Sequence, residues 1–208
     1  MHHLWNIWHS QWVITDGNYD HFRSGQIAHF ALEFHATDVK RIKSRPGTNC
    51  QQRGDGYLVE AEISALYSDA WTIDFGIAAY QNQPPPKRTT AGDQIKASIE
   101  LSVDPYPYFE YLSRREGIPA LIYEWRIERI TMVSSPVVLG YRPRIGRCWV
   151  PNNDQERRQD IDSTAAPPPP GFHYIREGNF LRATHSIAFM LQCARLNVPP
   201  TRFLSEPT

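Results

Sequence analysis

Residues 94–103 read QIKASIELSV, and apolar and polar side chains alternate along the whole stretch. Successive side chains of a β-strand point to opposite faces, so this period of two predicts a strand with one buried face. The turn signal Ala91-Gly92-Asp93 precedes the strand, and Asp104-Pro105 closes it. The buried face is expected to carry Ile95, Ala97, Ile99, Leu101 and Val103.

The same alternation recurs on both sides of this stretch. Residues 57–66 and 71–78 predict two strands joined by a turn at 68–70. Further strands are predicted at 8–14, 29–35 and 120–131, and residues 106–116 predict one short helical turn. Because no long helical stretch separates the strands, a βαβ arrangement is disfavoured. We therefore expect a mainly β protein with little helix: an antiparallel meander that closes as a small barrel or sandwich, with OB-like or SH3-like barrels as possible forms.

The composition of the chain changes near residue 151. Residues 1–150 are expected to form the barrel or sandwich domain, whereas 151–171 are polar and end in the proline run 167–170, as in an exposed loop or linker. Residues 172–208 are too few to build their own core and are expected to dock on the main domain. Within 186–198 the apolar residues alternate, which favours a strand, but several neighbours favour a helix, so both remain open.

Charge and cysteine content limit the classes of function. The chain carries 22 Lys and Arg against 22 Asp and Glu, so its formal net charge is zero. Neutrality argues against nucleic-acid binding by the whole surface and against a polybasic membrane protein, and no apolar run is long enough for a spanning helix. Cys50, Cys148 and Cys193 are widely spaced, which indicates neither a disulfide framework nor a zinc knuckle. Because the first residues lack a signal-peptide pattern, we expect a cytoplasmic protein with reduced thiols.

Several motifs that mark enzymes are absent from the sequence. It contains no GxSxG nucleophile elbow, no phosphate-binding P-loop, no GxGxxG fingerprint after a strand and no HExxH zinc motif. We therefore expect no cofactor, and we favour a non-catalytic role without closing the question of enzyme activity. The preferred hypothesis is an immunity-type or adaptor-type protein that binds another protein through loops and an aromatic surface.

The segment 104–111, DPYPYFEY, supplies the candidate surface. Its rings are concentrated between prolines, and rigid aromatic side chains are favoured anchors in protein interfaces. In the competing interpretation the segment caps one end of the barrel and turns its rings inward. The candidate partner-binding residues are Tyr106, Tyr108, Phe109 and Tyr111.

The first alternative is an OB-like protein that binds single-stranded nucleic acid. A basic loop beside aromatic residues can follow a phosphate backbone. The candidate residues for this role are Lys40, Arg41, Lys43, Arg45 and Arg53. A second basic group consists of Arg142, Arg144 and Arg147. Solvated loops between strands are the preferred interpretation of both groups, and a nucleic-acid partner is less favoured than a protein.

The second alternative is a metal-dependent enzyme. His29, Glu33 and His35 have the same parity in a predicted strand, and two imidazoles with a carboxylate can ligate non-haem iron. However, residues six positions apart in a strand lie about 20 Å from each other, so a third ligand must come from a neighbouring strand. A solvated strand face explains the same pattern. Neither a membrane partner nor a particular oligomeric state is expected from the sequence.

Overall fold

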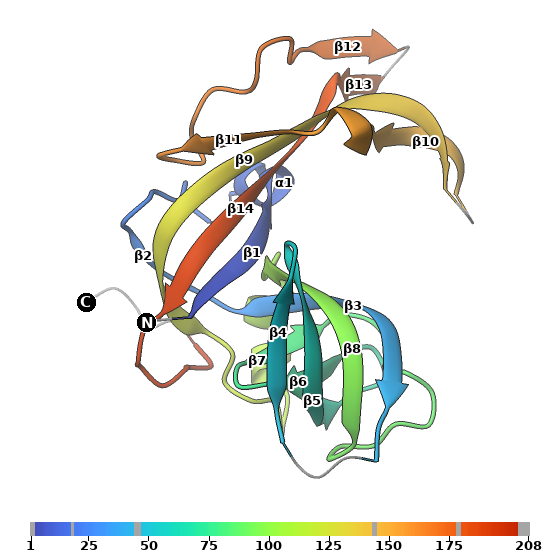
Figure 1. Ribbon diagram of the computed structural model, residues 1–208, viewed down its shortest axis with the longest axis vertical. Coiled ribbons are helices and arrows are strands. Elements are labelled where there is room, and N and C mark those ends of the chain that lie inside the picture. Colours follow the sequence, from blue (N-terminus) through green and yellow to red (C-terminus); the bar gives the residue numbers. More distant parts are fainter. Residues whose placement is uncertain (1–2, 18, 44–46, 143–144, 178–179, 204–208) are drawn as a thin grey trace. The chain divides into compact units, whose positions relative to one another are not determined.

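The computed structural model describes residues 3–17, 19–43, 47–142, 145–177 and 180–203 (Figure 1). It is mainly β, with 56% strand and 8% helix, which confirms the predicted fold class. The chain divides into two compact units: unit 1 comprises 1–8, 27–126 and 193–208, and unit 2 comprises 9–26 and 127–192. Strands β1 (Leu4–Ser10), β9 (Tyr123–Arg142) and β14 (His185–Arg195) contribute residues to both units.

Unit 1 contains a closed barrel of five strands. These are β3 (Leu32–Arg41), β5 (Gly56–Leu66), β6 (Trp71–Asp74), β7 (Ala78–Gln81) and β8 (Gln94–Val103). The strand order is β8-β3-β7-β6-β5, and β5 pairs back with β8 to close the ring. Only the β3–β7 pair in this ring is parallel. The bounds of β8 are those predicted from its alternation.

The strand order of the ring identifies its topology. From β5, two hairpins lead through β6 to β7, which pairs in parallel with β3. Strand β8 then joins β3 to β5 through antiparallel ladders on both of its sides. This is the cyclic strand order of an OB barrel. The one difference is chain order: β3 occupies the position of the last OB strand but comes first among the five strands here.

The interior of the barrel is built from the alternating positions of its strands. Val59, Ala61 and Ile63 on β5 have no exposed surface. The alternate residues from Ile95 to Leu101 on β8 are at most 2% exposed. The ring of Phe34 meets Trp71 edge to face at 4.9 Å. Burial of such aliphatic and aromatic side chains provides the main stabilisation of a barrel of this size.

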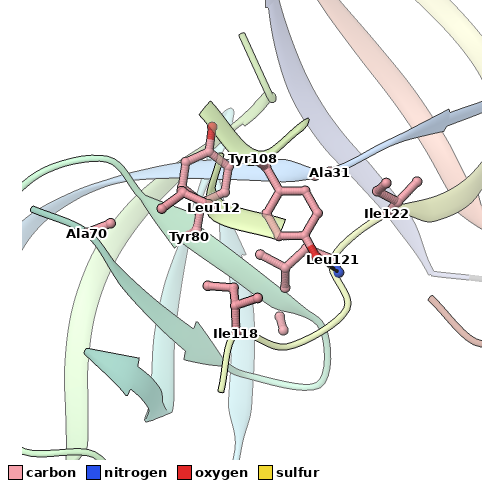
Figure 2. Close-up of a cluster of buried hydrophobic side chains, with 9 residues drawn as sticks. Ala31, Ala70, Tyr80, Tyr108, Leu112, Ile118, Leu121 and Ile122 are labelled. Carbon is pink, nitrogen blue, oxygen red and sulfur yellow. Dashed lines mark hydrogen bonds between the residues drawn. The ribbon is translucent and has the colours of Figure 1, made fainter. Parts of the chain in front are cut away.

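A second cluster of buried side chains in unit 1 adjoins β7 (Figure 2). It joins Tyr80 of that strand to residues of the segment 104–122, which contains α2 (Pro107–Glu110) and η1 (Leu112–Arg114). The rings of Tyr80 and Tyr108 lie 6.1 Å apart. The segment therefore covers this part of the barrel rather than extending into solvent.

Three predicted strands are interrupted in the structure. Residues 71–78 form β6, a turn and the start of β7, because Gly76 adopts φ +103° and its N–H donates to Asp74 Oδ1 at 2.9 Å. Residues 29–35 are divided between β2 (Ile27–Phe30) and β3, and residues 8–14 between β1 and α1 (Gln11–Thr15). Strand β4 (Asn49–Arg53), which pairs with β5, was not predicted.

Unit 2 is organised around the second part of β9. That part forms a hairpin with β10 (Gly146–Pro151) and also pairs with β11 (Arg157–Ile161). A short η2 (Asn153–Gln155) lies between them in sequence, so the segment predicted as a linker contains regular structure. β12 (Tyr174–Glu177) and β13 (Phe180–Ala183) form a separate two-stranded sheet. β14 establishes the strand alternative for residues 185–195.

No helix in the part of the chain that the structure describes is long and apolar enough to cross a membrane.

Candidate functional site

The aromatic segment 104–111 contributes mainly to the core of unit 1. Tyr108 has no exposed surface, and its hydroxyl donates to Pro119 O at 2.8 Å and accepts from Leu121 N at 3.0 Å. Phe109 packs partly buried against the same cluster. Tyr106 is half-buried. Tyr111 is partly exposed, and its hydroxyl donates to Asn82 Oδ1 at 2.7 Å. The arrangement is that of a cap, and it leaves Tyr108 no surface with which to contact a partner.

A buried carboxylate holds this cap in place. Asp104 has no exposed surface, and its Oδ1 accepts from the Tyr80 hydroxyl and from the backbone N–H of Tyr106 at 3.0 Å. The backbone N–H groups of Tyr108 and Phe109 also donate to this carboxyl, each at 3.3 Å. Burial raises the pKa of Asp104, although all four donors favour its ionised form. Its position is explained by loop anchoring and requires no catalytic role.

Glu33 on β3 lies near this carboxylate and is itself nearly buried. Burial and the neighbouring charge of Asp104 raise the pKa of Glu33 to about 7, and a hydrogen bond from the backbone of Asn82 opposes this shift. The folded protein therefore holds a proton on Glu33 more tightly than the unfolded chain does. Its contribution to stability is complete below the ordinary pKa and is lost as the pH rises through about 7.

Replacing Glu33 with Gln is expected to flatten the pH dependence of stability. The amide resembles the protonated acid, so the variant avoids a penalty that reaches about 3 kcal/mol in the parent above neutral pH. Unfolding free energies from urea titrations at several pH values check this result. Glu100→Gln, on the exposed face of neighbouring β8, is the control and should follow the parent. Parallel curves for the parent and Glu33→Gln would contradict the assignment.

The histidines proposed as metal ligands are held in separate pairs. His29 of β2 lies opposite Glu124 of β9, with 3.6 Å between Nε2 and Oε2. His35 lies 3.7 Å from Glu33, and β2 and β3 are distinct strands. Among the residues that the structure describes, no group of three or more His, Cys, Asp or Glu side chains is placed to hold a metal ion. His29 therefore lies on a different strand from Glu33 and His35, which are neighbours on β3.

The basic residues between 40 and 53 that the structure describes differ in their contacts. Arg41 makes an ion pair with Asp93 at 2.6 Å, and the Arg53 guanidinium donates to Gln51 Oε1 at 3.0 Å. Lys40 lies on β3 opposite Lys96, and Lys43 is exposed beyond the end of that strand. Arg45 lies outside the described residues. The ion pair of Arg41 reduces the positive charge that this region offers to a phosphate backbone.

The barrel face associated with nucleic-acid binding in OB folds is also covered. That face is formed by the second and third strands of the meander, which correspond here to β6 and β7. All four residues of β7 are buried, and Tyr108 of the cap packs beside Tyr80. No open row of rings is available on β7 for bases to stack on.

A group of exposed apolar side chains lies on a surface that the sequence pattern did not indicate. It lies on the β9–β10 hairpin of unit 2, where Leu139, Tyr141 and Ile145 are 55%, 73% and 68% exposed. We define the hairpin surface as the exposed apolar side chains of this element: Val138, Leu139, Tyr141, Ile145 and Trp149. Grouped exposure of this kind, unlike a single exposed side chain, marks interaction sites in folded proteins.

The charges on the hairpin are of one sign. Residues 137–151 contain three arginines and no acidic residue. Arg142 and Arg147 are exposed, and Arg144 lies outside the described residues. The guanidinium of Arg182 lies 3.7 Å from the centroid of the Trp149 ring, a cation–π contact that orients the ring. The surface thus combines exposed apolar groups with positive charge.

The signal for this surface was present in the sequence in part. The arginines indicate a basic region, but the pattern of apolar residues such as Leu139 and Trp149 does not indicate that they are exposed. Whether a strand in VVLGYRPRIGRCWVP is covered depends on what packs on it, and that is a tertiary property.

Comparison of the chain with models of protein families, with curated proteins and with solved structures finds no match.

Proposed function

We propose that this protein is a non-catalytic binding protein whose partner is another protein and whose contact site is the hairpin surface. The observation that carries the proposal is the exposure of five large apolar side chains on one hairpin of unit 2. Keeping such groups in water costs about 25 cal/mol for each Å² of apolar area, and a partner that covers them recovers this free energy.

The register of the hairpin places three of these groups, Leu139, Tyr141 and Trp149, on one face. Leu139 lies directly opposite Trp149, and Tyr141 lies opposite Arg147. Residues paired across an antiparallel ladder share a face, so these four side chains form a continuous patch. A patch with two aromatic rings, an aliphatic side chain and an arginine has the composition of a protein-binding hot spot.

The charges of the hairpin define the chemistry of the partner. Exposed Arg142 and Arg147 flank the apolar side chains, and no acidic residue lies between 137 and 151. A partner segment that combines acidic and apolar side chains satisfies both features, because opposite charges at the rim steer and orient association. The aliphatic side chains Val138, Leu139 and Ile145 favour a protein over a nucleic acid, whose bases stack on rings rather than on branched chains.

The backbone of the hairpin offers a further means of recognition. β10 is the last strand in the order of its sheet, so one of its edges has no neighbouring strand among the described residues. An edge strand presents N–H and C=O groups to which an extended segment of a partner can add. Alternate side chains of that segment would then contact the face that carries Trp149.

Site-specific photo-crosslinking tests the proposal. A photoreactive phenylalanine analogue at Tyr141 is expected to give a discrete adduct with one protein in the native cells. The same analogue at exposed Val198 of unit 1 is the control and should not give that adduct. Equal labelling from the two positions, or adducts with nucleic acid from Tyr141, would contradict the proposal.

The partner identified by crosslinking then allows a quantitative test. Replacing Leu139 and Trp149 together with Ser is expected to weaken binding of the purified partner by about 30-fold or more, since one central anchor contributes about 2 kcal/mol and neighbouring anchors are not additive. Arg147→Glu should weaken binding and reverse its dependence on salt. An unchanged dissociation constant in the double variant would show that contact lies elsewhere.

A further inference from the structure

Unit 1 contains a cavity beside the β6–β7 turn that the proposed function does not use. Its volume is about 490 Å³, within the range of small-molecule sites. The lining residues come from the start of the chain, from β4, from the turn and from the end of β14: His3, Trp5, Cys50, Phe75, Gly76, Ile77, Arg195, Leu196 and Asn197.

One wall of the cavity is apolar and preformed. Trp5, Phe75 and Ile77 are each at least nine-tenths buried, so their positions are set by packing. The rings of Trp5 and Phe75 meet edge to face at 6.0 Å, and Trp5 also packs 5.3 Å from Tyr57. A wall of ordered aromatic and aliphatic side chains suits a flat apolar ligand, because little conformational entropy is lost on binding.

The cavity also contains a cation, Arg195, for which the described residues provide no ionic partner. Arg195 Nη1 donates to the carbonyl oxygen of Gly76 at 3.2 Å, and its guanidinium lies 5.8 Å from the centroid of the Tyr123 ring. No described carboxylate makes an ion pair with Arg195, and no Asp or Glu lines the cavity. One of five guanidinium N–H groups is used on Gly76, so a planar fork of donors remains for a carboxylate.

The position of this arginine is supported by the backbone. It is the last residue of β14, and the N–H of the next residue, Leu196, donates to Glu124 O at 2.9 Å. The contact with Gly76 fixes the other end of the side chain at the β6–β7 turn. A held guanidinium loses less freedom on binding an anion than a free surface arginine does.

We propose that this cavity binds a small aromatic carboxylate, with its ring against Trp5 and Phe75 and its carboxylate on Arg195. Binding is non-covalent: burial raises the pKa of the Cys50 thiol to about 11, so this thiol stays protonated at neutral pH and is a poor nucleophile. The proposal is independent of the hairpin surface, which belongs to unit 2.

Titration of the full chain with 2-naphthoate tests the charge requirement, with 2-naphthalenemethanol as the neutral analogue. A ligand of this size is expected to bind with a dissociation constant of roughly 0.1 to 1 mM. Arg195→Gln should weaken binding of the naphthoate about tenfold and leave the alcohol unchanged, because it removes a charge-assisted pair. Arg53→Gln, at an exposed arginine outside this cavity, is the matched control. Equal affinities for acid and alcohol, or an unaffected Arg195→Gln, would overturn the proposal.

Alkylation by iodoacetamide at alkaline pH, where more of the Cys50 thiol is ionised, locates the bound probe. Cys50 lines the cavity, whereas Cys148 lies on β10, and both are half-buried. Saturating 2-naphthoate should slow modification of Cys50 several-fold and leave Cys148 unchanged. Protection of Cys148 alone, or of neither thiol, would show that the probe binds elsewhere. Arg195→Lys keeps the positive charge but lacks the planar guanidinium, so 2-naphthoate should protect Cys50 to an intermediate extent in this variant. Partial protection would show that the variant is folded and that the anion binds through its charge.

Discussion

Replacing Asp104 with Ala is expected to lower the unfolding free energy of unit 1 by about 4 kcal/mol. The carboxyl accepts hydrogen bonds from the Tyr80 hydroxyl and from three backbone N–H groups of the cap. Its removal leaves these donors buried without an acceptor in a site that has no exposed surface. Urea unfolding, followed by circular dichroism and by tryptophan fluorescence, measures the loss.

Two further variants separate this anchoring role from a general effect of charge. Asp104→Asn keeps an oxygen that can replace Oδ1, which serves Tyr80, Tyr106 and Tyr108, so we expect a smaller loss of about 1–2 kcal/mol. Asp154→Ala removes an exposed carboxylate and should change stability by less than about 0.5 kcal/mol. If Asp104→Ala were as stable as Asp154→Ala, the cap would not depend on this carboxylate.

Replacing Gly56 with Ala is expected to destabilise the barrel by about 3 kcal/mol. A Cβ atom at this position would lie 2.6 Å from the carbonyl oxygen of Ile99, far inside van der Waals contact. Gly56 begins β5 at the place where that strand pairs with β8 to close the ring, with Tyr57 opposite Ile99. The clash involves backbone, so relief requires the two strands to move apart.

Gly54, two residues earlier in the same turn, is the matched control. It adopts φ +60°, and a Cβ atom there would meet nothing within 4 Å. Gly54→Ala is therefore expected to cost only about 1 kcal/mol, the penalty of a left-handed backbone for an L-residue. Thermal or urea unfolding of both variants gives the comparison. Equal losses at the two positions would exclude the close approach of β5 and β8 as the cause.

The alternation of apolar and polar residues predicted the barrel strands well where one face of the strand is buried and the other is solvated. The bounds of β8 were predicted without error, and those of β5 within one residue, because both strands alternate for ten residues or more. The method failed at β6 and β7. Thr72 and all of Ala78–Gln81 are buried, so hydropathy does not mark the turn between them, which depends on Gly76 and on Asp74 as an acceptor.

The candidate sites depended even more than the strands on tertiary structure. The sequence indicated that rings are concentrated at 104–111, but whether they face a partner or the core depended on Asp104, Tyr80 and the closure of the barrel. His29, Glu33 and His35 were assigned to one predicted strand, but the division of β2 from β3 places His29 on a different strand from Glu33 and His35. The cavity of Arg195 brings together residues that are distant in sequence, and the side chains of the hairpin surface are exposed because the described residues do not fully cover them. Neither property can be predicted from a local sequence pattern.

The sequence by itself determined the β class of this protein, because a two-residue period is a local property of side chains on a strand. It also determined the neutral overall charge and the lack of familiar catalytic motifs. Only the tertiary structure decided that five strands close into a ring, that Tyr108 lies in the core, and that Tyr141 and Trp149 remain exposed. These outcomes depend on contacts between residues far apart in sequence, whose free energies arise from burial and from strand pairing across the fold rather than from neighbours along the chain.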